Sequence, residues 1–212
     1  MSAVFDRYRR KYYKIKFKPW FRGKSFTSDW TSRNFPEWQR ILRAHRRKPA
    51  RILEIGSWEG RSTIFFLRFL PHSTVTCVDT FDGGSGISSH DVGKLPGVEG
   101  RFDSNMRQFN GRVDKHKLDS DAALRLFADQ SRQFDIVYID GDHEPEQVLR
   151  DSLGAWELLS SEAVMIWDDY DSTPRCAIDK FLSQKDGQFI VLSKGHQIII
   201  LVPHHGRGDG LF

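Results

Sequence analysis

The chain has 212 residues, of which 39% are hydrophobic and 28% charged, and its formal net charge is +4 at pH 7. These values suit one globular domain and do not by themselves indicate a nucleic-acid-binding protein. No apolar run approaches the roughly 18 residues that span a bilayer, and the N-terminus lacks a signal-peptide core, so we expect no membrane span and a cytoplasmic location. Cys77 and Cys176 fit no metal-binding Cys-x-x-Cys pattern.

The first 24 residues carry an uneven basic charge. Arginines and lysines from Arg7 to Lys24 alternate with aromatic residues such as Tyr8 and Trp20, against the single acid Asp6. This pattern suits an arm that binds phosphates, RNA or an anionic membrane surface. It also suits a solvated segment whose aromatic side chains dock on the domain or on a second copy in a homodimer. Because no second basic patch accompanies the arm, we expect no nucleic-acid partner.

Beyond the arm, strand and helix patterns alternate along the chain. A helix capped by Ser32 or Asn34 is expected first, and a buried strand, a tight turn at Gly56 and Gly60 and a second helix follow it. The first predicted helix lies within residues 30–47, and the others cover about residues 62–70, 102–109, 119–127, 145–159 and 175–182. The predicted strands cover residues 51–55, 73–79, 113–118, 134–139, 163–167, 189–192 and 197–202.

This alternation predicts an α/β fold, a Rossmann-like, doubly wound and mainly parallel seven-stranded sheet. The last two strands flank residues 193–196 and predict a C-terminal antiparallel hairpin at the sheet edge. Residues 81–104, rich in Gly, Ser and Asp, are too long for an ordinary connection and predict a functional loop, in which His90 is a candidate substrate contact.

Acidic residues follow three of the predicted strands. Asp79 follows the second, Asp140 and Asp142 follow the fourth, and Asp168 and Asp169 follow the fifth. Ligands on such sheets bind beyond the carboxyl ends of the strands, and carboxylates gathered there are costly unless they are paired or coordinated. The sequence therefore predicts one polar site at this rim.

The glycine turn is not a dinucleotide fingerprint, because Trp58 stands where the second glycine of Gly-x-Gly-x-x-Gly belongs. It also lacks the Lys-Ser/Thr of a phosphate-binding loop. Asp79 follows Gly56 by 23 residues, a spacing that suits a carboxylate gripping ribose hydroxyls. We therefore expect a nucleoside ligand that carries something other than a pyrophosphate.

A family resemblance rests on these same residues. The run Glu54-Ile-Gly-Ser-Trp-Glu-Gly60, with Asp79, Asp140 and the final hairpin, resembles class I S-adenosylmethionine-dependent methyltransferases over roughly residues 50–202. The phrases Phe134-Asp-Ile-Val-Tyr-Ile-Asp-Gly-Asp-His143 and Trp167-Asp-Asp-Tyr170 narrow it to a bacterial subgroup similar to metal-dependent O-methyltransferases of the catechol and macrolide-sugar type.

The resemblance implies a role for each residue of the cofactor site. Asp79 would bind the ribose, and Ser62 would take the cofactor carboxylate at the positive end of its helix. The methionine end would lie on Glu54 and the backbone of Gly56, Ser57, Trp58 and Gly60, the adenine would lie beside Asp119 and Ser120, and Asp140 would complete the site. The residues alone also allow Ser62 and Ser120 to be helix caps and Asp79 to cap a turn.

A divalent cation is the second implied cofactor. Asp140, Asp168 and Asp169 end adjacent strands, and three close carboxylates repel one another unless a cation intervenes. An all-oxygen set suits Mg²⁺, with Mn²⁺ or Ca²⁺ as alternatives. In the enzymes that the chain resembles, Mg²⁺ at the matching positions binds substrate oxygens. The alternative is that Asp168 and Asp169 cap the next turn without a metal.

His143 is the candidate catalytic base, with Asp142 as its competitor, because its ordinary pKa suits proton transfer. We expect residues 1–48 to form an arm and N-terminal helix, and residues 49–212 to form an S-adenosylmethionine-binding domain whose loop 81–104 closes over the acceptor. The predicted function is Mg²⁺-assisted O-methylation of a small hydroxylated acceptor such as a sugar or polyol. Metal-independent methylation and an RNA-binding or RNA-modifying role remain alternatives.

Overall fold

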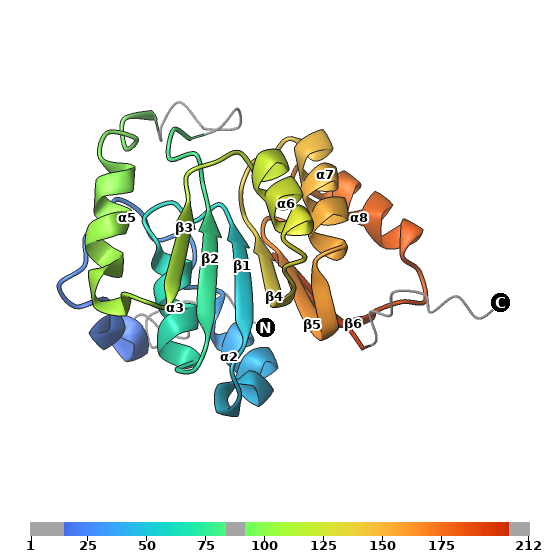
Figure 1. Cartoon of the computed structure of the whole chain (residues 1–212), viewed down its shortest axis with the longest axis horizontal. Helices are drawn as coiled ribbons and strands as arrows, with labels where there is room; N and C mark the ends of the chain where they lie inside the picture. The colour runs from blue at the N-terminus through green and yellow to red at the C-terminus, as the bar shows by residue number, and fades with distance from the viewer. Residues whose placement is uncertain (1–14, 84–91, 204–212) are drawn as a thin grey trace, which may run out of the picture.

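A seven-stranded sheet forms the centre of the molecule (Figure 1). The computed structural model describes residues 15–83 and 92–203. The strand order is β3-β2-β1-β4-β5-β7-β6, in which β1 to β5 pair in parallel and β7 runs antiparallel to both neighbours. The strands are β1 (Arg51–Ile55), β2 (Thr74–Val78), β3 (Val113–His116), β4 (Phe134–Ile139), β5 (Leu159–Trp167), β6 (Ile190–Lys194) and β7 (Ile198–Val202).

Helices cover both faces of the sheet because successive strand residues point to opposite sides. Ile52 faces a core shared with α3, whereas Leu53 faces a core shared with α6, α7 and α8. The first face carries η1 (Lys18–Phe21), α2 (Phe35–Ile41), η2 (Leu42–Arg47), α3 (Arg61–Phe69), α5 (Val98–Met106) and η3 (Arg107–Phe109). The second carries α6 (Ser120–Asp129), α7 (Pro145–Trp156) and α8 (Arg175–Gln184). The predicted doubly wound fold with its C-terminal hairpin is confirmed.

The central pair β1 and β4 is the switch point of this topology. From β1 the chain winds outward through β2 and β3, and from β4 it winds the other way through β5. A crevice opens where the two connections diverge, outside the carboxyl ends of the strands. The glycine turn after β1 and the acids after β4 and β5 all lie at this crevice.

The described part of the N-terminal arm packs against the chain's own core. Phe17 is buried, and its ring meets Phe35 and Phe65 edge-on at 5.2 and 6.0 Å between centroids. Trp38 of α2 stacks on Phe66 at 5.0 Å, so the N-terminal helix covers a sheet face. These aromatic residues are thus used internally, while the basic residues of the arm before position 15 lie outside the described residues.

Three predicted boundaries were wrong. Helix α7 ends at Trp156 and β5 begins at Leu159, although residues 145–159 were predicted as helix and 163–167 as strand. A bulge explains the longer strand, because the pairing register with β4 shifts and Glu162 takes a left-handed φ of 60°. Helix α5 begins at Val98 rather than Phe102. Asn34 precedes α2, but its side chain makes no capping bond.

No helix among residues 15–83 and 92–203 is long and apolar enough to cross a membrane.

Candidate active site

A cavity of about 520 Å³ lies at the crevice, a volume in the range of small-molecule sites. Every predicted site residue except Glu54 and Gly60 lines it. The wall contains Gly56, Ser57, Trp58, Ser62, Asp79, Asp119, Ser120, Asp140, Asp142, His143, Asp168 and Asp169. His90 and the rest of residues 84–91, which belong to the predicted loop 81–104, lie outside the described residues.

The glycine turn is shaped by a close approach between β1 and β4. Gly56 has a φ of +85°, and a Cβ atom there would lie 2.0 Å from the backbone oxygen of Asp140. A side chain at this position is therefore excluded both by φ and by the neighbouring backbone. Trp58, also at positive φ (46°), donates its backbone N–H to Oδ2 of Asp79 at 2.6 Å. The turn after β1 is thus fastened to the end of β2.

Glu54 lies behind the cavity wall rather than in it. Its side chain is fully buried in β1 and accepts a hydrogen bond from the Thr63 hydroxyl of α3. Burial raises the pKa of Glu54 to about 7, although hydroxyls of Ser62, Thr63 and Ser57 oppose that rise. We therefore interpret Glu54 as a residue that holds the turn and α3 together.

Asp79 presents its carboxylate at the edge of the cavity. Its second oxygen, Oδ1, accepts the backbone N–H of Phe81 at 2.6 Å, so the side chain does cap the local turn. Burial raises the pKa of Asp79, and these backbone donors oppose the shift. Each carboxylate oxygen keeps acceptor capacity for a ligand hydroxyl.

Behind Ser120 and Gln147 of the cavity wall lies a buried carboxyl, Asp151, that the sequence did not suggest. Asp119 caps α6 through the N–H of Ala122 at 2.7 Å. The Ser120 hydroxyl donates to Oδ1 of the fully buried Asp151 at 2.6 Å, and Gln147 donates to the same oxygen at 2.8 Å. Burial raises the pKa of Asp151 to about 6. The Ser120 hydroxyl is therefore held inward and does not cap the helix.

Two of the predicted metal ligands meet over a tyrosine. The buried Tyr138 hydroxyl lies 2.6 Å from Oδ2 of Asp140 and 3.0 Å from Oδ2 of Asp168. Burial and the Asp168 charge raise the pKa of Asp140 well above its ordinary value. Burial raises the pKa of Asp168, but hydrogen bonds from His196, Gln197 and the Asp169 backbone, together with the charge of His196, hold that pKa below its ordinary value. Asp140 therefore binds a proton more tightly than Asp168 does.

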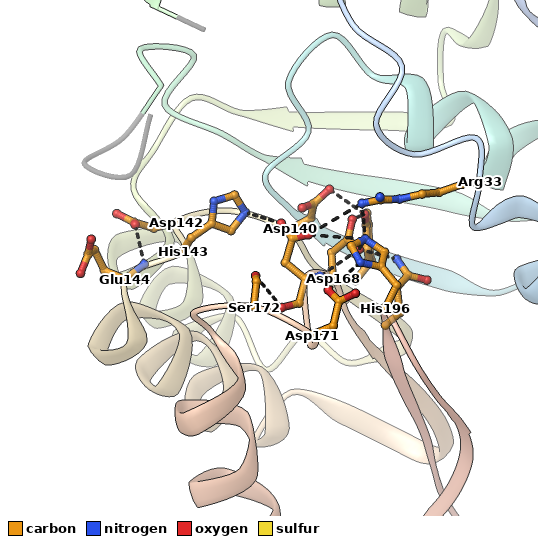
Figure 2. A network of polar contacts seen from close by, with 12 residues as sticks. Arg33, Asp140, Asp142, His143, Glu144, Asp168, Asp171, Ser172 and His196 are labelled. Carbon is orange, nitrogen blue, oxygen red and sulfur yellow. Dashed lines mark hydrogen bonds and ion pairs between the residues drawn. The ribbon is translucent and has the colours of Figure 1, made fainter. Parts of the chain in front are cut away.

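Basic side chains surround these acids, as Figure 2 shows. Nε2 of His143 lies 3.2 Å from Oδ2 of Asp169, and this contact raises the pKa of His143. His196, in the turn between β6 and β7, places Nε2 3.1 Å from Asp168. Arg33 reaches in from the N-terminal segment, 3.8 Å from Asp169. Part of the acidic charge is therefore neutralised by the chain itself.

Two sets of donor atoms at this rim have metal-site spacing, and they share Asp169. One is Asp140, His143 and Asp169, and the other is Asp168, Asp169 and His196; in each, the donor atoms lie within 4.8 Å of one another. Carboxylate and imidazole donors fit Mn²⁺ and Zn²⁺ as well as Mg²⁺. The predicted trio Asp140, Asp168 and Asp169 is thus divided between two sets, each with a histidine. Asp142 accepts the backbone N–H of Glu144 at 3.0 Å and stands apart from both.

Sequence reasoning missed Tyr138, Arg33, His196 and Gln197. Gln197 donates to Asp168 at 3.1 Å and accepts from the Trp38 indole at 2.7 Å. A hint of Tyr138 was present, because it lies in β4 two residues before Asp140, and alternate residues of a strand point to the same side. The other three reach the site only through the strand order and the course of the N-terminal segment, which no local pattern encodes.

The methyltransferase-domain family model matches residues 53–170. No protein of curated function matches the chain by sequence. Among solved structures, the chain is similar to the MycE methyltransferase of the mycinamycin biosynthetic pathway, in complex with Mg, S-adenosylhomocysteine (SAH) and mycinamycin VI. That likeness has 17% identity and a TM-score of 0.61 and covers 94% of this chain but 56% of MycE, so the chain spans about half of that protein.

Two further structures share the fold. An O-methyltransferase from Bacillus cereus in complex with SAH has 20% identity, a TM-score of 0.57 and 84% coverage of both chains. A protein from Clostridium thermocellum, proposed to be an rRNA methylase, has 15% identity and a TM-score of 0.56 and covers 81% of this chain and 97% of its own. At these identities the likenesses show a shared fold.

Proposed function

The chain belongs to the methyltransferase-domain family, and on that premise we propose that it is a class I O-methyltransferase that transfers the methyl group of S-adenosylmethionine to a small hydroxylated acceptor, with help from Mg²⁺. The observation that carries the proposal is that one cavity joins Asp79 to the acids Asp140, Asp168 and Asp169 and to His143. In this proposal the nucleoside site at Asp79 and the proton-accepting site at His143 share one cavity.

The cofactor site is proposed from its wall residues. Asp79 accepts the ribose hydroxyls, the turn from Gly56 to Trp58 receives the methionine end, and Ser62 at the start of α3 faces the carboxylate. Asp119 borders the adenine. Glu54 supports this wall from behind. The positive charge of the sulfonium suits a cavity whose wall is rich in carboxylates.

Methyl transfer needs an acceptor oxygen in line with the methyl carbon. The oxygen attacks that carbon as the bond from carbon to sulfur breaks, and SAH leaves with a neutral sulfur. His143 takes the hydroxyl proton on its imidazole, and Asp169 orients the ring and stabilises the charged form. Mg²⁺ held by Asp169 together with Asp140 or Asp168 would lower the pKa of the acceptor hydroxyl.

A metal-independent reaction is the second candidate, and one observation favours it. Arg33 and His196 already offset part of the charge of the acids that would otherwise need a cation. An RNA acceptor is less well supported, because phosphates would approach a carboxylate-rich cavity. We also propose a cytoplasmic location. We further propose a boundary after residue 48, between the N-terminal arm with its helix and the S-adenosylmethionine-binding domain.

The function can be tested by measuring SAH production from S-adenosylmethionine with a panel of sugars, polyols and catechols. We expect the methyl group to be transferred to an oxygen atom of the acceptor when Mg²⁺ is present. EDTA should abolish the rate of SAH formation, and added Mg²⁺ should restore it. An unchanged rate in EDTA would select the metal-independent candidate, and a methylated nitrogen or RNA product would overturn the proposal.

A further inference from the structure

Residues 24–33 form part of the cavity wall, and we call them the strap. Phe26, Ser28, Trp30, Thr31 and Arg33 line the cavity, and we call them the ligand face. The backbone of Ser25 and the side chains of Thr27 and Asp29 bind the scaffold, and we call these residues the anchoring face.

The anchoring face is held by strong polar contacts. The backbone N–H of Thr27 donates to Glu59 at 2.6 Å and its hydroxyl donates to the same carboxylate at 2.8 Å. Ser25 exchanges two hydrogen bonds with the Asn105 side chain, at 2.9 and 2.8 Å. Arg61, the first residue of α3, donates to Asp29 at 2.9 Å. The strap is therefore fixed to the cofactor turn, to α3 and to α5.

One polar group of the strap and one of the neighbouring cofactor turn are unpaired within the part of the chain that the structure describes. The Ser28 hydroxyl and the Trp58 indole N–H are buried, and neither has a hydrogen-bond partner among the described residues. Leaving such groups unpaired is costly, which points to a ligand that supplies the missing bonds. Trp30 remains 43% exposed although it borders the cavity. Its ring lies 5.6 Å from that of Trp58, tilted by 48°.

We propose that the strap is the acceptor-recognition wall, and that it selects a hydroxylated saturated ring such as a hexopyranose. The carbon face of the ring packs on Trp30, and a ring hydroxyl meets Ser28. Arg33 marks the end of the strap beside Asp169, so a ring lying along the strap reaches the acids with its far hydroxyl. This inference rests on the proposed function and names its acceptor class.

Segments on both sides of the proposed wall are linked to it. The Lys94 ammonium lies 5.2 Å from the Trp30 ring centroid, and the Lys94 carbonyl accepts from Arg101 at 2.6 Å. Arg101 also pairs with Glu59, the anchor of Thr27. The strap, the cofactor turn and the segment before α5 therefore form one connected frame around the acceptor position.

The test measures binding of methyl hexopyranosides and of catechol by saturation-transfer NMR to the full chain with SAH and Mg²⁺. We expect at least one hexopyranoside to bind, about 10- to 100-fold more weakly in Trp30→Ala and about 10-fold more weakly in Ser28→Ala. Trp30→Phe should recover most of the loss. Ile190→Ala, an exposed apolar residue on β6, is the matched control and should bind normally.

Calorimetry with SAH separates this inference from the function on which it rests. SAH affinity should stay within about two-fold in Trp30→Ala and Ser28→Ala. A larger loss of SAH affinity would make the strap a cofactor cover and overturn the acceptor assignment. Binding of catechol but of no hexopyranoside, or equal sugar binding by the variants, would also overturn it. No SAH binding by the wild type would instead refute the proposed function.

Discussion

Nε2 of His143 lies 3.2 Å from Oδ2 of Asp169, a contact that joins the loop after β4 to the end of β5. The contact fixes the His143 imidazole within the cavity. The competing candidate for the base, Asp142, accepts a hydrogen bond from the backbone N–H of Glu144. The geometry therefore favours His143 over Asp142 as the base that receives the acceptor proton.

Replacing the base should impair the chemical step without impairing cofactor binding. His143→Gln is expected to lower kcat by about 10²- to 10⁴-fold, since general bases contribute that much. Asp142→Asn should cost far less. Initial rates of SAH formation, with SAH affinity from calorimetry as the control, measure both. A larger rate loss in Asp142→Asn than in His143→Gln would reverse the assignment.

Glu54 should make stability depend on pH. Its folded pKa of about 7 lies above the unfolded value of 4.5, so the folded state binds the extra proton between these values. Stability from this group is full below about pH 4.5, falls as pH rises through the window and is lost above pH 7, by about 3 kcal/mol at most. Glu54→Gln cannot ionise and should lose that part of the slope.

Urea unfolding between pH 4.5 and pH 8 measures the effect, with the exposed Glu146→Gln as the matched control. The control should keep the wild-type pH dependence. A Glu54→Gln variant whose free energy of unfolding follows the wild-type curve would show that Glu54 does not titrate in this window.

Gly56→Ala should disrupt the turn, because the new methyl group would lie 2.0 Å from the Asp140 oxygen. We expect a loss of about 3 kcal/mol in the free energy of unfolding, or no folded protein, from φ strain and overlap together. Gly100→Ala on α5 is the control, since nothing lies within 4 Å of its Cβ position. It should be neutral or stabilise by up to about 1 kcal/mol. Equal thermal midpoints for the two variants would contradict this account.

A bound divalent cation should raise the thermal midpoint of the wild type. Mg²⁺ at about 100 times its Kd would stabilise the folded state by about 2.7 kcal/mol, because it binds that state alone. Asp169→Asn removes the residue shared by both donor sets and should abolish the shift. Asp129→Asn, an exposed residue at the end of α6 and outside both sets, should retain it. A wild type that shows no shift with Mg²⁺ or Mn²⁺ would leave the metal-independent reaction.

The sequence predicted the parts of the site that are local in the chain. Three of these residues, Gly56, Asp79 and Asp140, directly follow strands with clear apolar patterns. Because parallel strands place their carboxyl ends at one edge of the sheet, the sequence could predict that these residues lie at the same edge. Leu159 was assigned to the wrong element because helical spacing continues past Trp156 and a bulge was not foreseeable. His196 was missed because its approach to Asp168 depends on β7 pairing antiparallel to β5. Contacts of this kind arise from tertiary packing and leave no periodic signal.

The central claim is that the cavity binds S-adenosylmethionine through Asp79, and calorimetry with SAH tests it most directly. The wild type should bind SAH, and Asp79→Ala should weaken binding about 100-fold, because two ribose hydroxyls lose a charged acceptor. The exposed Asp129→Ala on α6 should bind as the wild type does. Absence of heat with SAH, or an Asp79→Ala variant that binds SAH as tightly as the wild type, would contradict the account.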